Sequence, residues 1–221
     1  MSNQTIFLSH FLTEETPGYG GKKDFKVRHM SRISEGANSN SQEWTLSNHI
    51  GTHIDLPSHF DNEGSRMEHF KSDDWIFNNP YLLHLSSLPG TILDINELFE
   101  KIPMNVDFLI IKTDFQKYRN EELYWLNNPG LSPNLAAWLR EKRPNVKCLG
   151  FDFISITSYT NRPLGRIAHK AFLGTDGKTN PLRVIEDMKL DQLVNHPKSV
   201  IVAPILIFNA DGAPVTVIAT I

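Results

Sequence analysis

The sequence predicts a single α/β domain built on a mixed sheet, and three observations lead to this fold class. The chain has 221 residues, of which 40% are hydrophobic, which is enough for one sizeable core. Short apolar runs such as Phe108–Lys112 and Lys147–Ile154 have the length and composition of buried strands. Strands and helices are predicted to follow one another without the strict strand–helix–strand repeat of a parallel fold, so we expect a mixed sheet.

The first half of the chain is predicted to consist mostly of strands. The runs with strand character are Thr5–Leu8, Phe25–Arg32, Glu43–Asn48 and Tyr81–Leu85. A loop of turn-forming residues separates the first two strands and carries Tyr19. Asp94–Glu97 resembles a capping box, which predicts a short helix that ends before Pro103.

The second half is predicted to contain two helices and a terminal hairpin. Ser132 and Pro133 are typical of a helix start, and they predict a helix over Asn134–Lys142. A second helix is predicted over Gly165–Leu173, closed by Gly174, and a polar loop follows at 175–181. The last elements are predicted to be the strands Ser199–Phe208 and Val215–Ile221, with a hairpin turn at Asp211–Gly212.

Composition and charge argue against several classes of function. The net charge is −3 and no block of Lys or Arg occurs, so we expect neither nucleic acid nor an anionic membrane as a partner. The amino terminus lacks the pattern of a secretory signal and no apolar run is long enough for a membrane span, which favours a cytoplasmic protein. Cys148 is the single cysteine and is expected to be a buried core thiol. The class of function that remains is binding or conversion of a small molecule.

The segment from His49 to His59 concentrates the side chains that bind divalent metals or transfer protons near neutral pH, namely His49, His53, Asp55 and His59. A helix would turn Asp55 away from the two imidazoles, and a flat strand would hold His49 and His53 about 13 Å apart. A strand that ends near His49 and turns through Gly51 would let both imidazoles and the carboxylate converge. The spacing therefore favours a metal site on a turn.

The motif H-x-G-T-H-x-D-x-P-x-H, read from His49 to His59, resembles that of the cyclase-like metal-dependent hydrolase family, which includes bacterial kynurenine formamidase (arylformamidase) and isatin hydrolase. Other segments resemble family blocks in the same order, and they cover nearly the whole chain: Leu109–Asp114, Asn128–Pro133, Gly150–Ser155, His169–Glu186 and Gly212–Val215. The resemblance implies a barrel-like mixed sheet of the swivelling β/β/α type and assembly as a homodimer or higher homo-oligomer.

The same resemblance implies roles for individual residues. His49, His53 and Asp55 match the family's ligands of a first metal ion, and His169 and Glu186 match the ligands of a second. The cofactor would be Zn²⁺ or Mn²⁺, with one or two ions per subunit. His59 remains for proton transfer, and its place past the rigid Pro57 suits a general base.

The expected reaction is metal-dependent hydrolysis of an amide C–N bond, most simply of N-formyl-L-kynurenine to L-kynurenine and formate. Two alternatives stay open: hydrolysis of a cyclic amide such as isatin, and a metal-bound small-molecule binding protein without turnover. Tyr19 and Phe25 are candidate substrate contacts on a lid, although their loop could equally be an ordinary flexible connection. Thr216 stands where many relatives carry an arginine, which leaves the identity of the substrate open.

Overall fold

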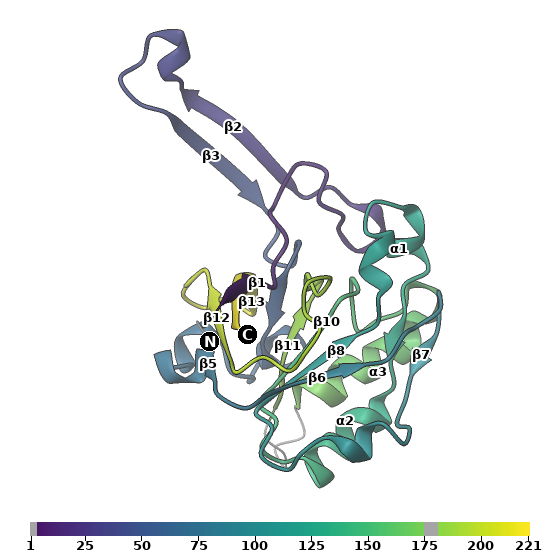
Figure 1. Ribbon diagram of the computed structural model, residues 1–221. Helices are drawn as coiled ribbons and strands as arrows, with labels where there is room; N and C mark the ends of the chain where they lie inside the picture. The colour runs from purple at the N-terminus through teal and green to yellow at the C-terminus, as the bar shows by residue number, and fades with distance from the viewer. Residues whose placement is uncertain (1–3, 175–180) are drawn as a thin grey trace.

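Most strands join one curled, mixed sheet (Figure 1). In the computed structural model, which describes residues 4–174 and 181–221, nine strands pair in the order β5-β12-β13-β4-β11-β10-β8-β6, with β1 beside β13. The bounds of these strands are β1 Thr5–Phe7, β4 His53–Asp55, β5 Ile76–Phe77, β6 Pro80–His84, β8 Phe108–Lys112, β10 Cys148–Phe151, β11 Arg183–Glu186, β12 Ser199–Pro204 and β13 Gly212–Thr220.

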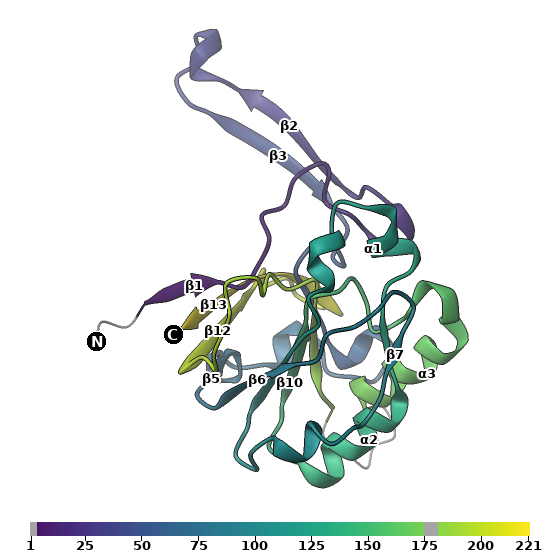
Figure 2. The ribbon, with the colours of Figure 1, turned by 45° about the vertical axis from the view of Figure 1, so that its right-hand side comes forward.

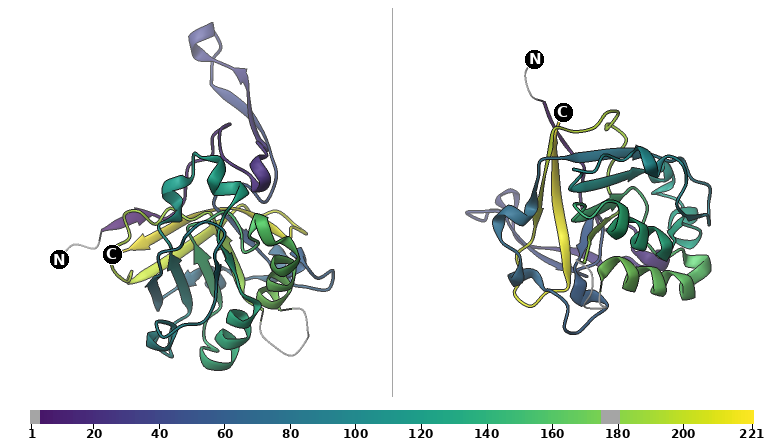
Figure 3. Two further views of the ribbon diagram at one scale, coloured as in Figure 1. Left: turned by 90° about the vertical axis from the view of Figure 1, so that its right-hand side faces the viewer. Right: turned by 90° about the horizontal axis from the view of Figure 1, so that it is seen from below.

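The sheet is mixed and nearly closed on itself. Strands β6, β8, β10 and β11 are parallel to one another, whereas β4 pairs antiparallel with both β11 and β13. The two ends of the order, β5 and β6, follow each other in the sequence, so the sheet curls toward a barrel, as the view from below shows (Figure 3). The predicted mixed, barrel-like α/β fold is confirmed.

Both faces of the parallel strands are buried, because β8 alternates between two cores. Phe108 and Ile110 pack inside the curled sheet, and Leu109 and Ile111 pack on the opposite face. That opposite face is covered by helices α2 (Pro133–Lys142) and α3 (Arg162–Leu173) (Figure 2). The smaller elements on this side are α1 (Glu122–Leu126), β7 (Ile92–Leu93) and β9 (Gly130–Leu131).

Two strands stand apart from the sheet as a projecting arm. Strands β2 (Phe25–Ser31) and β3 (Ser41–Leu46) pair only with each other among the described residues, and they extend far from the body (Figures 1 and 2). Both were predicted as strands, with ends displaced by one or two residues. Residues 32–40 connect them, and the two strands pair antiparallel.

The helix predictions are confirmed in the second half of the chain and wrong at one site in the first. Ser132 caps α2 by accepting from the backbone N–H of Asn134, and Gly174 closes α3 at φ 68°. Over Asp94–Glu97 no helix forms, because the Asn96 side chain accepts the backbone N–H of Leu98 and favours a turn. Only a short 3₁₀ turn follows, at Phe99–Lys101.

The predicted terminal hairpin exists, but its turn lies elsewhere. Strand β12 ends at Pro204 rather than Phe208, and β13 begins at Gly212. The chain reverses around Asn209, whose φ is 66°. The predicted polar loop at 175–181 lies almost wholly outside the described residues. Across residues 4–174 and 181–221, no helix combines the length and apolarity needed to cross a membrane.

Candidate functional site

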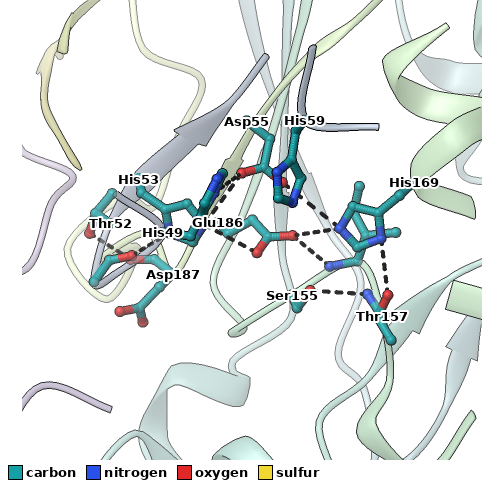
Figure 4. A network of polar contacts seen from close by, with 12 residues as sticks. His49, Thr52, His53, Asp55, His59, Ser155, Thr157, His169, Glu186 and Asp187 are labelled. Atoms are coloured by element: carbon teal, nitrogen blue, oxygen red, sulfur yellow. Dashed lines mark hydrogen bonds and ion pairs between the residues drawn. The ribbon is translucent and has the colours of Figure 1, made fainter. Parts of the chain in front are cut away.

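A glycine turn folds the histidine motif into a cluster. Gly51 adopts φ 62°, and a Cβ there would lie 2.5 Å from the Leu12 side chain, so the position requires glycine. The turn places His49 beside the end of β4, where its Nδ1 lies 2.8 Å from Oδ1 of Asp55. The predicted convergence of His49, His53 and Asp55 around Gly51 is therefore present in the structure (Figure 4).

Two buried imidazoles are held in the tautomer that metal ligands need. His53 donates its Nδ1–H to the Gly51 carbonyl at 2.8 Å. Nδ1 of His169 lies 3.0 Å from the Gly165 carbonyl, to which it donates, and 3.0 Å from the Thr157 hydroxyl. In both residues these bonds occupy Nδ1 and direct Nε2 at the carboxylates of the cluster. Burial alone would lower the pKa of both imidazoles, but Asp55 and Glu186 outweigh burial and raise it.

Asp55 and Glu186 lie between these two imidazoles, each with one oxygen toward either ring (Figure 4). Nε2 of His53 is 3.4 Å from Asp55 and 3.5 Å from Glu186, and Nε2 of His169 is 3.8 Å and 3.7 Å from the same two residues. These gaps exceed hydrogen bonds, but they match the spacing of about 3.4 Å between two ligands that sit about 2.1 Å from one tetrahedral ion. The ligand atoms of His53, Asp55 and Glu186 all lie within 4.8 Å of one another, and so do those of His49, Asp55 and His59, so the cluster has two groups whose geometry fits a divalent metal.

Sheet pairing and a buried ion pair place Glu186. Strand β11 pairs antiparallel with β4 so that Glu186 is opposite His53. The next residue, Asp187, is buried and accepts hydrogen bonds from Arg119 and, at 2.5 Å, from the Tyr124 hydroxyl. Because a buried charge is stable only when it is paired and hydrogen-bonded, this network anchors the end of the strand that carries Glu186.

Hydrogen bonds set the charge state of the cluster. Burial by itself would lower the pKa of His49, but its hydrogen bonds to Asp211 and Asp55 outweigh burial and raise the pKa to about 10, so this imidazole must release a proton before it can bind a metal. Burial would raise the pKa of Asp55, yet hydrogen bonds to His49 and His53 hold it well below the usual range. The carboxylate is thus ionised in the buried site, as a metal ligand must be.

Asp211 is a site residue that sequence reasoning missed. One of its oxygens lies 2.9 Å from Nδ1 of His59 and 3.2 Å from Nε2 of His49, and its other oxygen accepts from Asn48 at 2.6 Å. Together with the short 3₁₀ turn that begins at Pro57, these contacts fix His59 with Nδ1 toward Asp211. Its Nε2 is then the nitrogen left for proton transfer.

The pair Asp211–Gly212, which was predicted to form a hairpin turn, lies at the start of β13, where a close contact requires the glycine. Gly212 lies opposite Asp55 in the pairing of β13 with β4. A Cβ at this position would lie 2.5 Å from the Ile54 carbonyl and 2.7 Å from Cε1 of His49. The glycine therefore permits close approach to the histidine, and the aspartate before it reaches the site.

A pocket of about 540 Å³ opens over the cluster, between the base of the arm and α3. All six predicted metal and proton-transfer residues line it, as does Tyr19. The Tyr19 ring packs against Tyr159, with ring centroids 5.4 Å apart, and its hydroxyl lies beside Arg162. Phe25 is buried at the base of β2 and does not belong to the pocket wall.

Two other titratable core residues, Cys148 and Asp152, lie outside the candidate site. Burial raises the pKa of the Cys148 thiol to about 12, so the thiol is protonated at neutral pH. Burial also raises the pKa of Asp152, to about 6, while its Oδ1 accepts from Thr113. Neither residue lines the pocket.

Comparison with known proteins identifies the family of the chain. A family model described as "Putative cyclase" matches residues 6–158. The kynurenine formamidase of Geobacillus thermodenitrificans (strain NG80-2) is 32% identical over 216 residues, which cover 97% of this chain and 96% of the relative. The kynurenine formamidase of Bacillus mycoides (strain KBAB4) is 26% identical, with 97% and 96% covered.

Among solved structures, isatin hydrolase A from Labrenzia aggregata superposes with a TM-score of 0.80 at 20% identity, covering 99% of this chain and 94% of the other. This likeness shows a shared fold. The family match and the coverage of the Geobacillus relative confirm the resemblance carried by the histidine motif, and the chain belongs to the cyclase family.

Proposed function

We propose that this protein hydrolyses an amide C–N bond with the help of divalent metal, and that its substrate is N-formyl-L-kynurenine, which yields L-kynurenine and formate. The observation that carries the proposal is the buried cluster in which Asp55 and Glu186 each face both His53 and His169. The kynurenine formamidase of Geobacillus, which shares this chain's full length, supports the choice of substrate.

The family resemblance and the cluster together support the choice of ligands. His49, His53 and Asp55 would hold a first ion, and His169 and Glu186 would hold a second. The two oxygens of Asp55 face different histidines, so Asp55 lies next to both sets. Zn²⁺ and Mn²⁺ both suit imidazole and carboxylate ligands, so the choice between them remains a matter for measurement. Such an ion, when bound, polarises the amide carbonyl and makes water more acidic.

His59 moves the proton. It lines the pocket beside His49, with ring centroids 4.0 Å apart, and Asp211 accepts its Nδ1–H. Nε2 takes a proton from the attacking water and returns it to the departing nitrogen, so that the amide and water become an amine and a carboxylic acid. The stack of Phe60 on His169, with centroids 4.6 Å apart, gives this side of the pocket an apolar wall.

A substrate panel tests the proposal. The metal-reconstituted protein would be assayed with N-formyl-L-kynurenine, other formylated anilines, isatin and simple cyclic amides, with metal-free protein as the control. We expect metal-dependent release of formate from N-formyl-L-kynurenine with the highest kcat/KM of the panel. If isatin is hydrolysed with the highest kcat/KM instead, the proposed substrate is wrong, but the proposed metal-dependent hydrolysis of an amide C–N bond stands. A metal-replete protein that binds these compounds and turns over none of them would be a binding protein, and the proposal would be wrong.

We also propose that the protein assembles as a homodimer or higher homo-oligomer. The arm exposes Met30, Ile33 and Trp44, with 62% of the Trp44 side chain accessible. A two-stranded hairpin is marginal on its own in water, and a second copy of the chain would cover these apolar residues. Light scattering on the purified protein measures its mass, and a monomer at micromolar concentration would contradict the proposal. A cytoplasmic location remains a prediction.

A further inference from the structure

Two arginines stand at the mouth of the pocket on the helix that carries His169. Arg162 and Arg166 both line the cavity, and both are exposed to solvent. They are one helical turn apart, so their side chains project from the same face of α3. With a rise of about 1.5 Å per residue, Arg166 and Arg162 lie about 4.5 Å and 10.5 Å along the axis from His169.

Neither arginine forms an ion pair with a carboxylate in the part of the chain that the structure describes, although the same chain pairs Arg28, Arg32 and Arg119 with carboxylates. The other charged residues at the mouth, Lys22 and Asp24, contribute one charge of each sign. Arg162 and Arg166 are therefore two cations of the pocket wall that no described carboxylate pairs with, whereas the carboxylates of Asp55 and Glu186 in the same wall face the histidine cluster.

Aromatic packing orients one of the two guanidinium groups. The Arg162 guanidinium lies over the Tyr159 ring at 4.0 Å from the centroid, and over Tyr19 at 5.9 Å. A stacked guanidinium keeps its N–H groups in the plane of the fork, available to a planar anion. The Tyr19 side chain lies in the same wall and interacts with Arg162 through a hydrogen bond as well as through its ring.

We infer that Arg162 and Arg166 bind a carboxylate carried by the substrate while its amide lies at the histidine cluster. The substrate class is then an acylated aromatic amine whose side chain ends in a carboxylate, a few bonds from the amide that is cleaved. Guanidinium and carboxylate form paired, charge-assisted hydrogen bonds, which are the strong ones in proteins. This inference rests on the proposed amide hydrolysis and adds the group that selects the substrate. A neutral cyclic amide such as isatin would gain nothing from the two arginines.

The test compares an anionic with a neutral substrate in the metal-reconstituted protein. N-formyl-L-kynurenine carries the carboxylate, and ortho-formamidoacetophenone offers the same scissile amide without it. In the double variant Arg162→Gln, Arg166→Gln we expect KM for the anionic substrate to rise on the order of 10- to 100-fold more than KM for the neutral one, with kcat for both changing little. The control is Lys170→Gln, an exposed cation on the same helix outside the pocket wall, which should change neither KM.

Calorimetric titration separates this inference from the proposed function, because it needs no turnover. The wild type should bind benzoylpropanoate more tightly than neutral butyrophenone, and the double variant should lose this preference. If the wild type shows the preference and cleaves no amide, the proposed function fails and the carboxylate site stands. If amides are cleaved but the double variant keeps the preference, the anion binds elsewhere and the inference is wrong. Equal rises of KM for both substrates would also overturn it.

Discussion

The two halves of the candidate site are built in different ways. One half is local: its residues lie between positions 49 and 59, on a turn, a short strand and a second turn. The other half is assembled from three distant elements. The local residues are His49, His53, Asp55 and His59, and the assembled ones are His169 on α3, Glu186 on β11 and Asp211 before β13.

The short strand β4 is where the halves meet. It pairs with β11 on one side, which puts Glu186 opposite His53, and with β13 on the other side, which puts Gly212 opposite Asp55. The local half depends on turn geometry at one glycine, whereas the assembled half depends on the register of the sheet, which a one-residue slip would destroy. Variants in each half should therefore fail in different ways.

The largest effect is expected in the local half, from His53→Ala. This change removes a buried imidazole that faces both carboxylates of the cluster. Metal content, measured by elemental analysis, should fall sharply, and turnover should be lost with it. His29→Ala, an exposed histidine on the arm, is the matched control and should keep its metal. A full complement of metal in His53→Ala would show that the assigned ligands are wrong.

A nearly equal loss of activity, but a smaller loss of metal, is expected from Glu186→Gln in the assembled half. The glutamine keeps the shape of the side chain and removes the charge that faces His169. Titration of the metal-free wild type should reach two ions per subunit, and the variant should lose one of them. A wild type that saturates at a single ion would contradict the two-ion site.

What could be predicted from the sequence follows the same division. The convergence of His49, His53 and Asp55 was predictable because all three lie within reach of one glycine turn, a local rule. Asp211 was not predictable as a site residue, since only the pairing of β13 with β4 brings it to His49 and His59. His169 and Glu186 were found through family resemblance rather than spacing.

Phe25 was expected to contact the substrate from the same loop as Tyr19, but it lies outside the pocket wall. Local sequence rules could not predict this, because it depends on how the arm is placed. Alternation of apolar residues predicted both strands of the arm, but nothing local states that they pair with each other and leave the body. Tyr19 precedes the arm and reaches the pocket, whereas Phe25 starts β2 and is buried at its base. A loop and the strand after it can thus face different parts of the molecule.

An intermediate effect is expected from His59→Gln, which separates proton transfer from metal binding within the local half. The variant should retain its metal, because His59 is held by Asp211 rather than by the two central carboxylates. Turnover should fall by about 10²- to 10⁴-fold, the usual contribution of a positioned acid–base group. Loss of metal in this variant would make His59 a ligand, and nearly wild-type activity would assign the proton to another group.

The smallest effect is expected from Asp211, which acts on the reaction through its neighbours. It contacts His59 and His49 but lies outside the pocket wall, so KM should stay near the wild-type value while kcat falls. Removing such an outer hydrogen-bond partner costs about 10- to 100-fold, and we expect the upper end for Asp211→Ala. Asp211→Asn keeps an acceptor oxygen and loses only the charge, so it should recover most of kcat. An asparagine variant as slow as the alanine variant would show that the charge, rather than the orientation of His59, is what the site requires. An alanine variant with wild-type kcat would show that the turn at Pro57 positions His59 without Asp211.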